Sequence, residues 1–396
     1  MNALDFDIAI IGSSFAGMTS ALAIAKISPE IKIAIIDKQE IFKHSRQSDG
    51  RAFAISKSSL NLFQEIDIYQ DLFSVAGKIT DIKITDYKSP IFLDFLSSEL
   101  DDSDKEMGLI IENHFIFEAL KKQILLQKNI EVFSPNFYTD INFFDNFSQI
   151  ILNDNKLINS KLILACDGRF SKLRELYKIK TKIKNYHQTA LVFKISHQIP
   201  HNNIAFERFI SNGPLAILPL QDPHQSSIVW INNDDFFEVL NKIDEENFIQ
   251  QLQKKSENCL GKIKIISEKF SYPLNLVLAD EFYHHNILFI GDSACAIHPI
   301  AGQGYNLAIN SIKILQKLLT QNLLNGLKIN DENLIQQYQK NARNDAKKMA
   351  IATDLLNNIF ESKSVAIRYG RNIGLGAINL LPSLKKFFIA KAGGLK

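Results

Sequence analysis

The 396-residue chain has few cysteines, one tryptophan and no long uncharged apolar run. Its three cysteines, Cys166, Cys259 and Cys295, lie far apart and form no C-x-x-C pair. This spacing argues against a disulfide framework and against a metal site. No apolar run reaches the ~18–20 residues of a transmembrane helix, and the N-terminal residues lack the basic region of a secretory signal. We therefore expect an intracellular protein of a reducing compartment, which meets a membrane only from the side.

Acidic residues are absent from the end of the chain. None follows Glu361, whereas seven Lys and Arg residues do. Since the whole chain has a net charge of +2, residues 1–361 carry about −5. This asymmetry predicts an anionic partner surface. No basic patch interleaved with aromatic residues is present, so we expect no nucleic-acid partner. Two alternatives stay open: a helix that lies on an anionic membrane, or a helix pair packed on the body with a solvated basic rim.

The beginning of the chain has the pattern of a dinucleotide-binding turn. Two apolar runs, DIAIIG and IKIAIID, flank a helical stretch within the first 37 residues. Gly12 allows a tight turn, and Gly17 allows the helix to pack closely on the strand. Asp37 follows Gly17 by twenty residues, where an acid can accept hydrogen bonds from ribose hydroxyls. Ser14 occupies the middle position of the motif, which is normally a third glycine.

Two further apolar runs also end in polar residues. KLILACDG ends at Asp167 and Gly168, and NILFIGD ends at Asp292. Ligands of open α/β sheets bind beyond the carboxyl ends of the strands. If DIAIIG, KLILACDG and NILFIGD belong to one parallel sheet, their ends therefore converge on one site.

The stretch after Asp292 combines a proline, two glycines and a helix. Pro299 makes the loop rigid, and Gly302 and Gly304 let the backbone pass close to a flat ligand. From about Gln303 onward the apolar residues have helical spacing. The positive end of this helix favours negative charge on the ligand, which a reduced flavin and a phosphate both satisfy.

These motifs resemble those of a known family. GSSFAG, CDGRFSKLR and GDSACAIHPIAGQGYNL resemble, in this order, the three fingerprints of class A flavin monooxygenases with the para-hydroxybenzoate hydroxylase-like fold. HPIAGQG, together with DGRAFAIS, ERF, GPLAILPL, IVWI and the C-terminal RYGRNIGLGAINLLPSLKK, resembles the branch of ubiquinone-biosynthesis aromatic-ring hydroxylases. The resemblance covers nearly the whole chain.

The resemblance implies an FAD site. Gly12, Ser14 and Gly17 would surround the pyrophosphate, and Asp37 would bind the adenosine ribose. The remaining implied contacts are Arg51 near the adenosine ribose and pyrophosphate, Asn113 and Asp292 at the ribityl chain, Asp167 of the second fingerprint, and Pro299, Gly302, Gln303 and Gly304 along the flavin ring. His298 adjoins residues 299–304, which we call the flavin loop. It is the one candidate catalytic residue, with a structural role as its alternative. No metal ligands are expected.

Three positions depart from the family pattern. Ser14 replaces a glycine, Cys295 replaces a histidine, and Ser311 replaces an acid. We expect them to change flavin affinity and the tuning of the flavin more than the fold.

The resemblance also implies a fold of α/β class, in which a Rossmann-like FAD-binding domain is interleaved with an antiparallel-sheet substrate domain and followed by C-terminal helices. Residues 1–77, 107–181 and 282–340 would form the FAD-binding domain and residues 78–106 and 182–281 the substrate domain, leaving 341–396 as a C-terminal helical segment in possible contact with a membrane. A length of 396 residues agrees with about two domains.

The implied function is hydroxylation of the aromatic ring of a polyprenyl-phenol in ubiquinone biosynthesis, through a flavin C4a-hydroperoxide formed with O₂. NAD(P)H or an electron carrier would reduce the FAD. The protein would lie on the cytoplasmic side of the inner membrane, with other ubiquinone-biosynthesis proteins as candidate partners. Two alternatives stay open: a flavin reductase or dehydrogenase without oxygen insertion, and a non-catalytic scaffold subunit of a quinone-synthesis complex.

Overall fold

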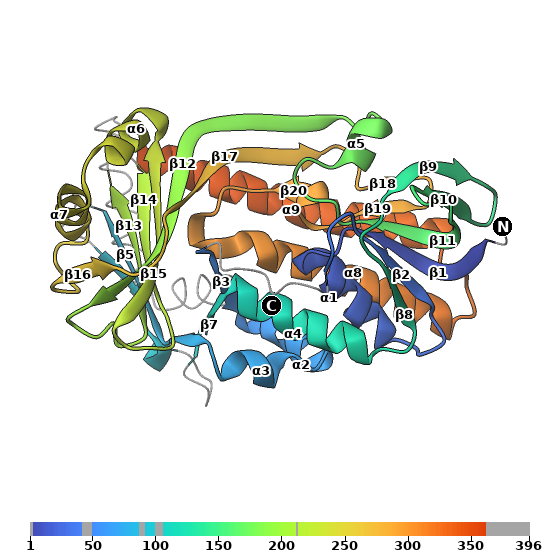
Figure 1. The fold of residues 1–396 in the computed structure, drawn as a ribbon, viewed down its shortest axis with the longest axis horizontal. Coiled ribbons are helices and arrows are strands. Elements are labelled where there is room, and N and C mark those ends of the chain that lie inside the picture. Colours follow the sequence, from blue (N-terminus) through green and yellow to red (C-terminus); the bar gives the residue numbers. More distant parts are fainter. Residues whose placement is uncertain (1–2, 42–49, 87–91, 100–105, 211–212, 362–396) are drawn as a thin grey trace.

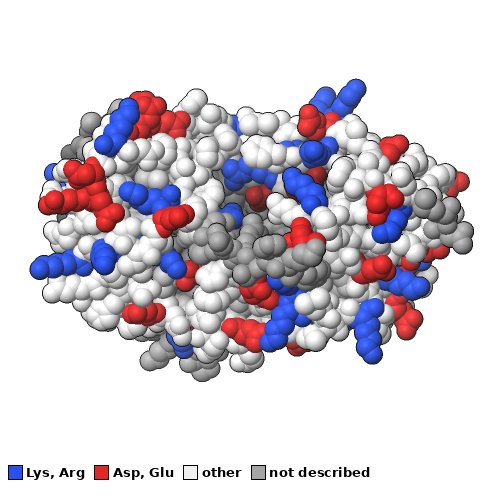
Figure 2. Space-filling view, viewed as in Figure 1, with Lys and Arg blue, Asp and Glu red and all other residues white. Residues whose placement is uncertain are grey.

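The computed structural model describes residues 3–41, 50–86, 92–99, 106–210 and 213–361. The basic segment after Glu361, with its expected membrane contact, lies outside the described residues. Within these ranges the chain forms two large sheets, a small sheet between them and helices on their faces (Figure 1). Between the two ends of the molecule the surface is hollowed, and acidic atoms lie there among basic side chains (Figure 2).

An eight-stranded sheet occupies one end of the molecule (Figure 1). Its central strands run parallel. They are short runs of Ile, Leu and Ala because a parallel sheet is buried on both faces. In spatial order its main strands are β18 (Tyr283–His284), β19 (Ile287–Phe289), β11 (Leu157–Ala165), β1 (Leu4–Ile11), β2 (Ile33–Ile36) and β8 (Ile130–Phe133). The antiparallel strands β9 (Tyr138–Phe143) and β10 (Ser148–Leu152) extend from β11.

Helices cover this sheet and continue along the molecule (Figure 1). They are α1 (Phe15–Ala25), α4 (Asn113–Leu126), α5 (Lys172–Leu176), α8 (Gln303–Leu324) and α9 (Glu332–Glu361). Helix α1 is buried along nearly its whole length, between the sheet and its neighbours α4 and α8. Helix α9 runs without a break past residue 341. Among the described residues, none of the helices is both long and apolar enough to span a membrane.

A nine-stranded, mostly antiparallel sheet forms the other end. Its main strands, in spatial order, are β20 (Cys295–Ala296), β17 (Phe270–Ala279), β12 (Thr181–His197), β15 (Gln225–Asn233), β14 (Gly213–Pro219), β13 (Ile204–Ile210), β5 (Asp81–Asp86) and β6 (Phe92–Phe95), and β16 (Ile263–Ile265) pairs with β12. Helices α6 (Asp234–Lys242) and α7 (Glu245–Lys255) cover its outer face, where Phe193, Trp230 and Phe248 form an apolar core.

A three-stranded sheet lies between the two large sheets (Figure 1). It contains β3 (Ala52–Ser56), β7 (Gly108–Glu112) and β4 (Gly77–Ile79), with α2 (Lys57–Glu65) and α3 (Tyr69–Phe73) beside it. The 3₁₀ turns are η1 (Ser97–Glu99), η2 (Gly291–Ser293) and η3 (Ile300–Gly302). Lys194 of β12 and Glu112 of β7 form an ion pair of 2.9 Å, which ties the nine-stranded sheet to the small one.

Candidate cofactor site

The carboxyl ends of four parallel strands lie in one row across the eight-stranded sheet. Ile11 of β1 is in register with Ile36 of β2 and with Ala165 of β11, and Ala165 is in register with Phe289 of β19. The residues that follow these strands are Gly12, Asp37, Cys166 with Asp167, and Ile290 with Asp292. The expected convergence of the strand ends is therefore confirmed.

The first strand end requires glycine at two positions. Gly12 has a φ of +100°, and a Cβ atom there would lie 2.5 Å from the carbonyl oxygen of Cys166. A Cβ atom on Gly17 would lie 1.9 Å from the carbonyl oxygen of Gly12. Ser14 precedes α1, and its exposed side chain forms no capping hydrogen bond. The turn therefore has no room for a side chain at Gly12 or Gly17, whereas the Ser14 side chain is exposed.

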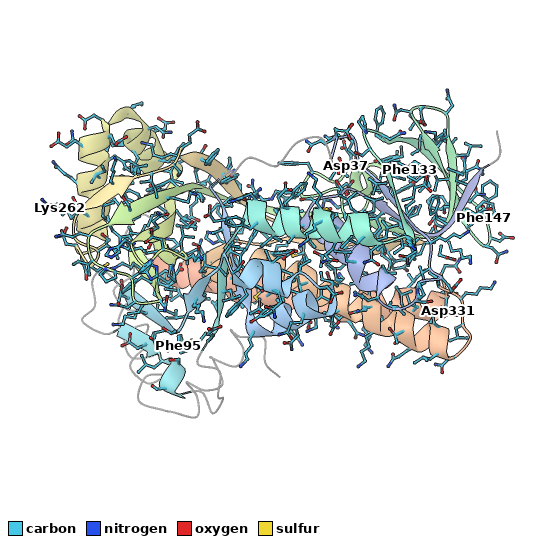
Figure 3. The ribbon with its side chains drawn as sticks, turned by 60° about the horizontal axis from the view of Figure 1, so that its bottom comes forward. Asp37, Phe95, Phe133, Phe147, Lys262 and Asp331 are labelled. Atoms are coloured by element: carbon cyan, nitrogen blue, oxygen red, sulfur yellow. The ribbon has the colours of Figure 1, made fainter. Side chains whose placement is uncertain are left out.

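Asp37 is held against this turn. Its Oδ2 atom accepts hydrogen bonds from the backbone N–H (2.7 Å) and the hydroxyl (2.6 Å) of Ser13, and its Oδ1 atom accepts one from the Gln39 N–H (2.8 Å). Its own N–H donates to the carbonyl oxygen of Phe133, the last residue of β8, and both side chains lie at this strand end (Figure 3). A carboxylate has about four acceptor positions. The half-buried Asp37 therefore keeps acceptor capacity for an outside hydroxyl.

Asp167 contributes an oxygen without a hydrogen-bond partner among the described residues to the end of β11. Its Oδ2 atom accepts a hydrogen bond of 3.2 Å from the Leu173 N–H in α5. Its Oδ1 atom is buried without a hydrogen-bond partner among the described residues. Burial raises the pKa of Asp167, although hydrogen bonds from Ser171 and Leu173 act in the opposite direction. An unpartnered buried oxygen is costly, so it marks a place where an outside donor would stabilise the fold.

Asp292 follows β19, and the charges of two arginines act on it. The residue is partly open to solvent, desolvation of its carboxyl group raises the pKa of Asp292, and the charges of Arg169 and Arg51 lower it. Both arginines also touch β17: Arg51 lies over the Tyr272 ring at 5.3 Å, and Arg169 donates to the carbonyl oxygen of Pro273.

The loop after Asp292 approaches the small sheet. Pro299 precedes η3, and its carbonyl oxygen accepts a hydrogen bond of 2.9 Å from the Gly302 N–H. Gly302 has a φ of +63°, and a Cβ atom there would lie 3.0 Å from the Cβ atom of Ala54. Gln303 begins α8, as expected from the sequence, and a Cβ atom on Gly304 would meet open space. Gly302 is therefore needed for the turn, whereas Gly304 leaves room beside the helix.

Asn306 and Asn113 fasten this loop to its surroundings. The Asn306 amide nitrogen donates to the carbonyl oxygen of Ala54 (2.7 Å), and its Oδ1 atom accepts from the Ser56 N–H (3.0 Å) and the Ser59 hydroxyl (2.8 Å). Asn113 is fully buried at the start of α4, and its N–H donates to the carbonyl oxygen of Arg51 (3.0 Å). Asn113 and Arg51 are therefore brought together.

His298 is enclosed by protein. It is fully buried, and its Nε2 atom shares a hydrogen bond of 2.9 Å with the Gln188 side chain. The Tyr186 ring meets the imidazole edge-to-face, with 4.8 Å between ring centroids. Burial lowers the pKa of His298 to about 4. The imidazole is therefore neutral near pH 7 and has no access to solvent, which favours the structural alternative over a catalytic role.

Two of the departures from the family pattern are neighbours. Cys295 and Ser311 line the same small pocket between η2, α8 and α9. Both are buried, and the Ser311 hydroxyl donates to the carbonyl oxygen of Ala308 at 2.7 Å. Burial raises the pKa of Cys295 to about 12, so its thiol stays protonated. The replacements at positions 295 and 311 therefore lie in the same pocket.

The sequence did not single out Arg169, Arg174 or Asn306. Arg174 is buried and donates to the carbonyl oxygens of Ser293 (2.6 Å) and Arg169 (2.7 Å), which joins the residues after β11 to those after β19. Both arginines belong to the RFSKLR stretch after Asp167, so two basic residues beside a strand end were the available signal. Asn306 offered no comparable signal, because a lone Asn in a helix has many possible roles.

Comparison with known proteins decides the family. A model of the FAD-binding domain matches residues 146–353, which is just over half of the chain. The chain belongs to the FAD-binding domain family. Over 98% of its length it is 28% identical to the ubiquinone hydroxylase UbiL of Rhodospirillum rubrum, of which 89% is covered. Over 99% of its length it is 25% identical to the ubiquinone hydroxylase UbiM of Neisseria meningitidis, of which 85% is covered.

Solved structures share the fold of this FAD-binding protein. The p-nitrophenol 4-monooxygenase PnpA of Pseudomonas putida matches with a TM-score of 0.80 at 13% identity, covering 99% of this chain and 98% of PnpA. PqsL of Pseudomonas aeruginosa in complex with 2-aminobenzoylacetate matches with a TM-score of 0.75 at 16% identity, covering 94% of this chain and all of PqsL. The expected α/β fold of FAD-dependent monooxygenases is therefore confirmed.

The strand-end residues fit FAD on geometric grounds. Gly12 and Gly17 keep the turn clear of side chains, as a bound pyrophosphate requires. Asp37 retains acceptor capacity, and the buried Oδ1 atom of Asp167 has no partner among the described residues. Gly304 leaves space at the start of α8, where the helix dipole favours negative charge.

Proposed function

We propose that this protein is an FAD-dependent monooxygenase that hydroxylates the aromatic ring of a polyprenyl-phenol in ubiquinone biosynthesis. The observation that carries the proposal is similarity over nearly the full chain to two proteins named ubiquinone hydroxylases. The fit of the strand ends to FAD supports it, since ring hydroxylation requires an activated oxygen that protein side chains alone do not provide.

The proposed FAD contacts follow the positions of the strand ends. Gly12, Ser14 and Gly17 would cradle the pyrophosphate, helped by the N-terminus of α1. Asp37 and Arg51 would bind the adenosine half, and Asn113 and Asp292 the ribityl chain. Pro299, Gly302, Gln303 and Gly304 would line the flavin ring, and Asp167 of the second fingerprint would serve both FAD and the nicotinamide donor.

When bound, FAD supplies the redox chemistry that activates O₂. The protein must hold the phenol ring beside it and exclude water. An apolar surface suited to this lies next to the flavin loop, because Ala54, against which Gly302 lies, belongs to an apolar cluster with Ala205 and Leu218 of the nine-stranded sheet. We assign the bound ring to the space between this sheet and Gly302.

NAD(P)H or a small electron carrier is the proposed electron donor. The sequence has no second G-x-G-x-x-G motif after an apolar run of strand type, so a separate nicotinamide domain is not expected. A nicotinamide would then react at the flavin site itself.

Contact with an anionic membrane is proposed for the basic residues after Glu361. Lys385, Lys386 and Lys391 provide charge without neighbouring acids. We expect the triple change to Gln to weaken co-sedimentation with anionic vesicles at low salt, and unchanged sedimentation would contradict this contact.

A complementation experiment tests the proposed function. The protein would be expressed in bacterial hosts that each lack one ring hydroxylase of ubiquinone synthesis, and quinone lipids would be measured by mass spectrometry. We expect restored quinone in one host and no restoration by a Gly302→Trp variant, whose side chain would fill the loop beside Ala54. Soluble yellow protein without rescue in any host would favour a reductase, and soluble colourless protein would favour a scaffold.

A further inference from the structure

One acidic residue interrupts an apolar row that crosses the nine-stranded sheet. Residues in register on adjacent strands point to the same face of a sheet. The row runs through Val192 of β12, Val229 of β15, Ala216 of β14, Glu207 of β13, Ile84 of β5 and Leu93 of β6. Glu207 therefore has apolar side chains on both sides along this row.

Glu207 lies on the face directed toward the flavin loop. Side chains alternate along β13, and Phe206 and Ile210 pack into the outer core under α6 and α7. Ala205, two residues before Glu207, packs instead with Ala54, the residue against which Gly302 lies. This face is turned toward the rest of the molecule, opposite α6 and α7 (Figure 1).

Among the described residues, no hydrogen bond or opposite charge compensates the carboxyl group of Glu207. The side chain is partly accessible to solvent, yet burial raises its pKa to about 7, and no charge or hydrogen bond of the described residues contributes to the shift. Phe209, the next residue of β13 on this face, stacks on Phe360 of α9 with 3.4 Å between ring centroids. This pair of rings therefore limits the access of solvent to the Glu207 carboxyl group from one side.

Two other charged side chains of the described residues, Lys194 and Asp86, lie on this face. Lys194 of β12 is paired with Glu112 at 2.9 Å. Asp86 of β5 is buried beyond Ile84, in register with Phe209 rather than with Glu207. An acid that serves stability is normally paired or exposed to water. An uncompensated acid on an apolar face beside a cofactor site is instead typical of a functional group.

We propose that Glu207 binds the hydroxyl group of the phenol substrate and accepts its proton during ring hydroxylation. This assignment rests on the proposed function. A prenylated phenol matches the site, because its isoprenoid and ring satisfy the apolar row and its single O–H group satisfies the carboxylate.

The proton transfers balance within the reaction. As the new C–O bond forms, the phenol O–H bond breaks, its proton moves to the Glu207 carboxylate, and its electron pair forms a ring carbonyl. The ring then loses the proton of the hydroxylated carbon to solvent, and the carbonyl oxygen recovers a proton from Glu207. The net change is C–H to C–OH, with the second oxygen atom of O₂ leaving as water and the two electrons coming from the reduced cofactor.

A binding experiment on the oxidised holoenzyme tests the assignment. The probes are 2-farnesylphenol and its methyl ether, which lacks the hydroxyl proton, and binding is followed by the flavin absorbance and by calorimetry. We expect the wild type to prefer the phenol by about tenfold or more, and Glu207→Gln to reduce this preference to about threefold or less. The control Glu131→Gln changes an exposed acid of β8 and should behave as wild type.

The wild type alone gives a second test. Its preference for the phenol over the ether should increase as the pH rises through about 7, when the carboxylate forms. A preference that is constant between pH 5.5 and 8.5, or one retained by Glu207→Gln, would overturn the role of Glu207 even if the variant proved unstable.

Turnover separates this inference from the proposed function. We expect Glu207→Gln to retain its FAD and to lower kcat for ring hydroxylation by about 10²-fold, with Glu207→Asp restoring part of it. If the wild type hydroxylates the phenol and Glu207→Gln is equally active with the same pH profile, only the role of Glu207 fails. If the wild-type holoenzyme neither binds nor hydroxylates the phenol, the proposed function fails as well.

Discussion

At the scale of single residues, two glycines of the candidate site differ in what their missing side chains allow. A Cβ atom on Gly17 would collide with the backbone of Gly12 at 1.9 Å, whereas one on Gly304 would meet open space. The fold therefore requires glycine at position 17, whereas Gly304 leaves a space that no described side chain fills. The sequence motifs identified both glycines, but they did not show that one is needed for backbone packing and the other leaves space.

Paired substitutions make this difference measurable. Gly17→Ala should reduce stability by more than about 3 kcal/mol, because backbone must move to admit the methyl group. Gly304→Ala should leave stability unchanged or raise it by up to about 1 kcal/mol, since Ala favours the helix, while lowering FAD affinity. Urea unfolding and the ratio of flavin to protein measure the two effects. Full flavin retention by Gly304→Ala would remove this position from the cofactor site.

Glu207 predicts an unusual dependence of stability on pH. Its pKa is raised from 4.5 to about 7 by burial, so its contribution to stability is fully present below pH 4.5 and is lost as the pH rises through about 7. Glu207→Gln removes this titration. At pH 8 we expect the variant to be more stable than wild type by about 1–2 kcal/mol, a value reduced for the partial access of solvent. Unfolding at pH 5 and pH 8 checks this, and equal differences at both values would exclude an uncompensated carboxylate.

At the scale of elements, the strand ends were predictable and the strand pairings were not. Apolar runs that end in Gly or Asp identified β1, β2, β11 and β19, because buried parallel strands need continuous apolar sequence. The row that contains Glu207 depends on β13 pairing with β5, more than a hundred residues earlier. Local sequence does not specify such long-range order and register. His298 shows the same limit, because its enclosure by Tyr186 and Gln188 of β12 is a tertiary property.

Asn306 connects two elements of the candidate site, and its removal should affect both. Its side chain joins the first turn of α8 to Ala54, Ser56 and Ser59. Asn306→Ala leaves buried backbone groups of β3 without partners, so we expect a loss of about 1–3 kcal/mol and weaker FAD binding. Gln321→Ala, at an exposed position of the same helix, is the matched control. If both variants unfold and bind FAD alike, Asn306 does not organise the loop.

At the scale of the whole molecule, the division into an FAD-binding and a substrate domain remains a prediction. The chain passes several times between the two large sheets. Strand β12 connects the two regions, because it pairs with β15 in the sheet that holds Glu207 and its Gln188 contacts His298 beside the flavin loop. Composition and length indicated two domains, but the interleaving came from family resemblance. Helix α9, which spans residue 341, also shows that the C-terminal segment does not begin at a break in structure.

The ion pair between Lys194 and Glu112 should couple the nine-stranded sheet to the small sheet. Both side chains are largely buried, at 22% and 16% exposure, and Glu112 directly precedes Asn113 at the start of α4. Breaking one partner leaves a partly desolvated charge, so Lys194→Met and Glu112→Gln should each cost about 1–3 kcal/mol, and the double variant less than their sum. A double-mutant cycle by urea unfolding measures this coupling. The same variants should weaken phenol binding more than FAD binding, because the pair sets the position of the sheet that carries Glu207. A coupling energy near zero would mean that this ion pair does not help to hold the two sheets together.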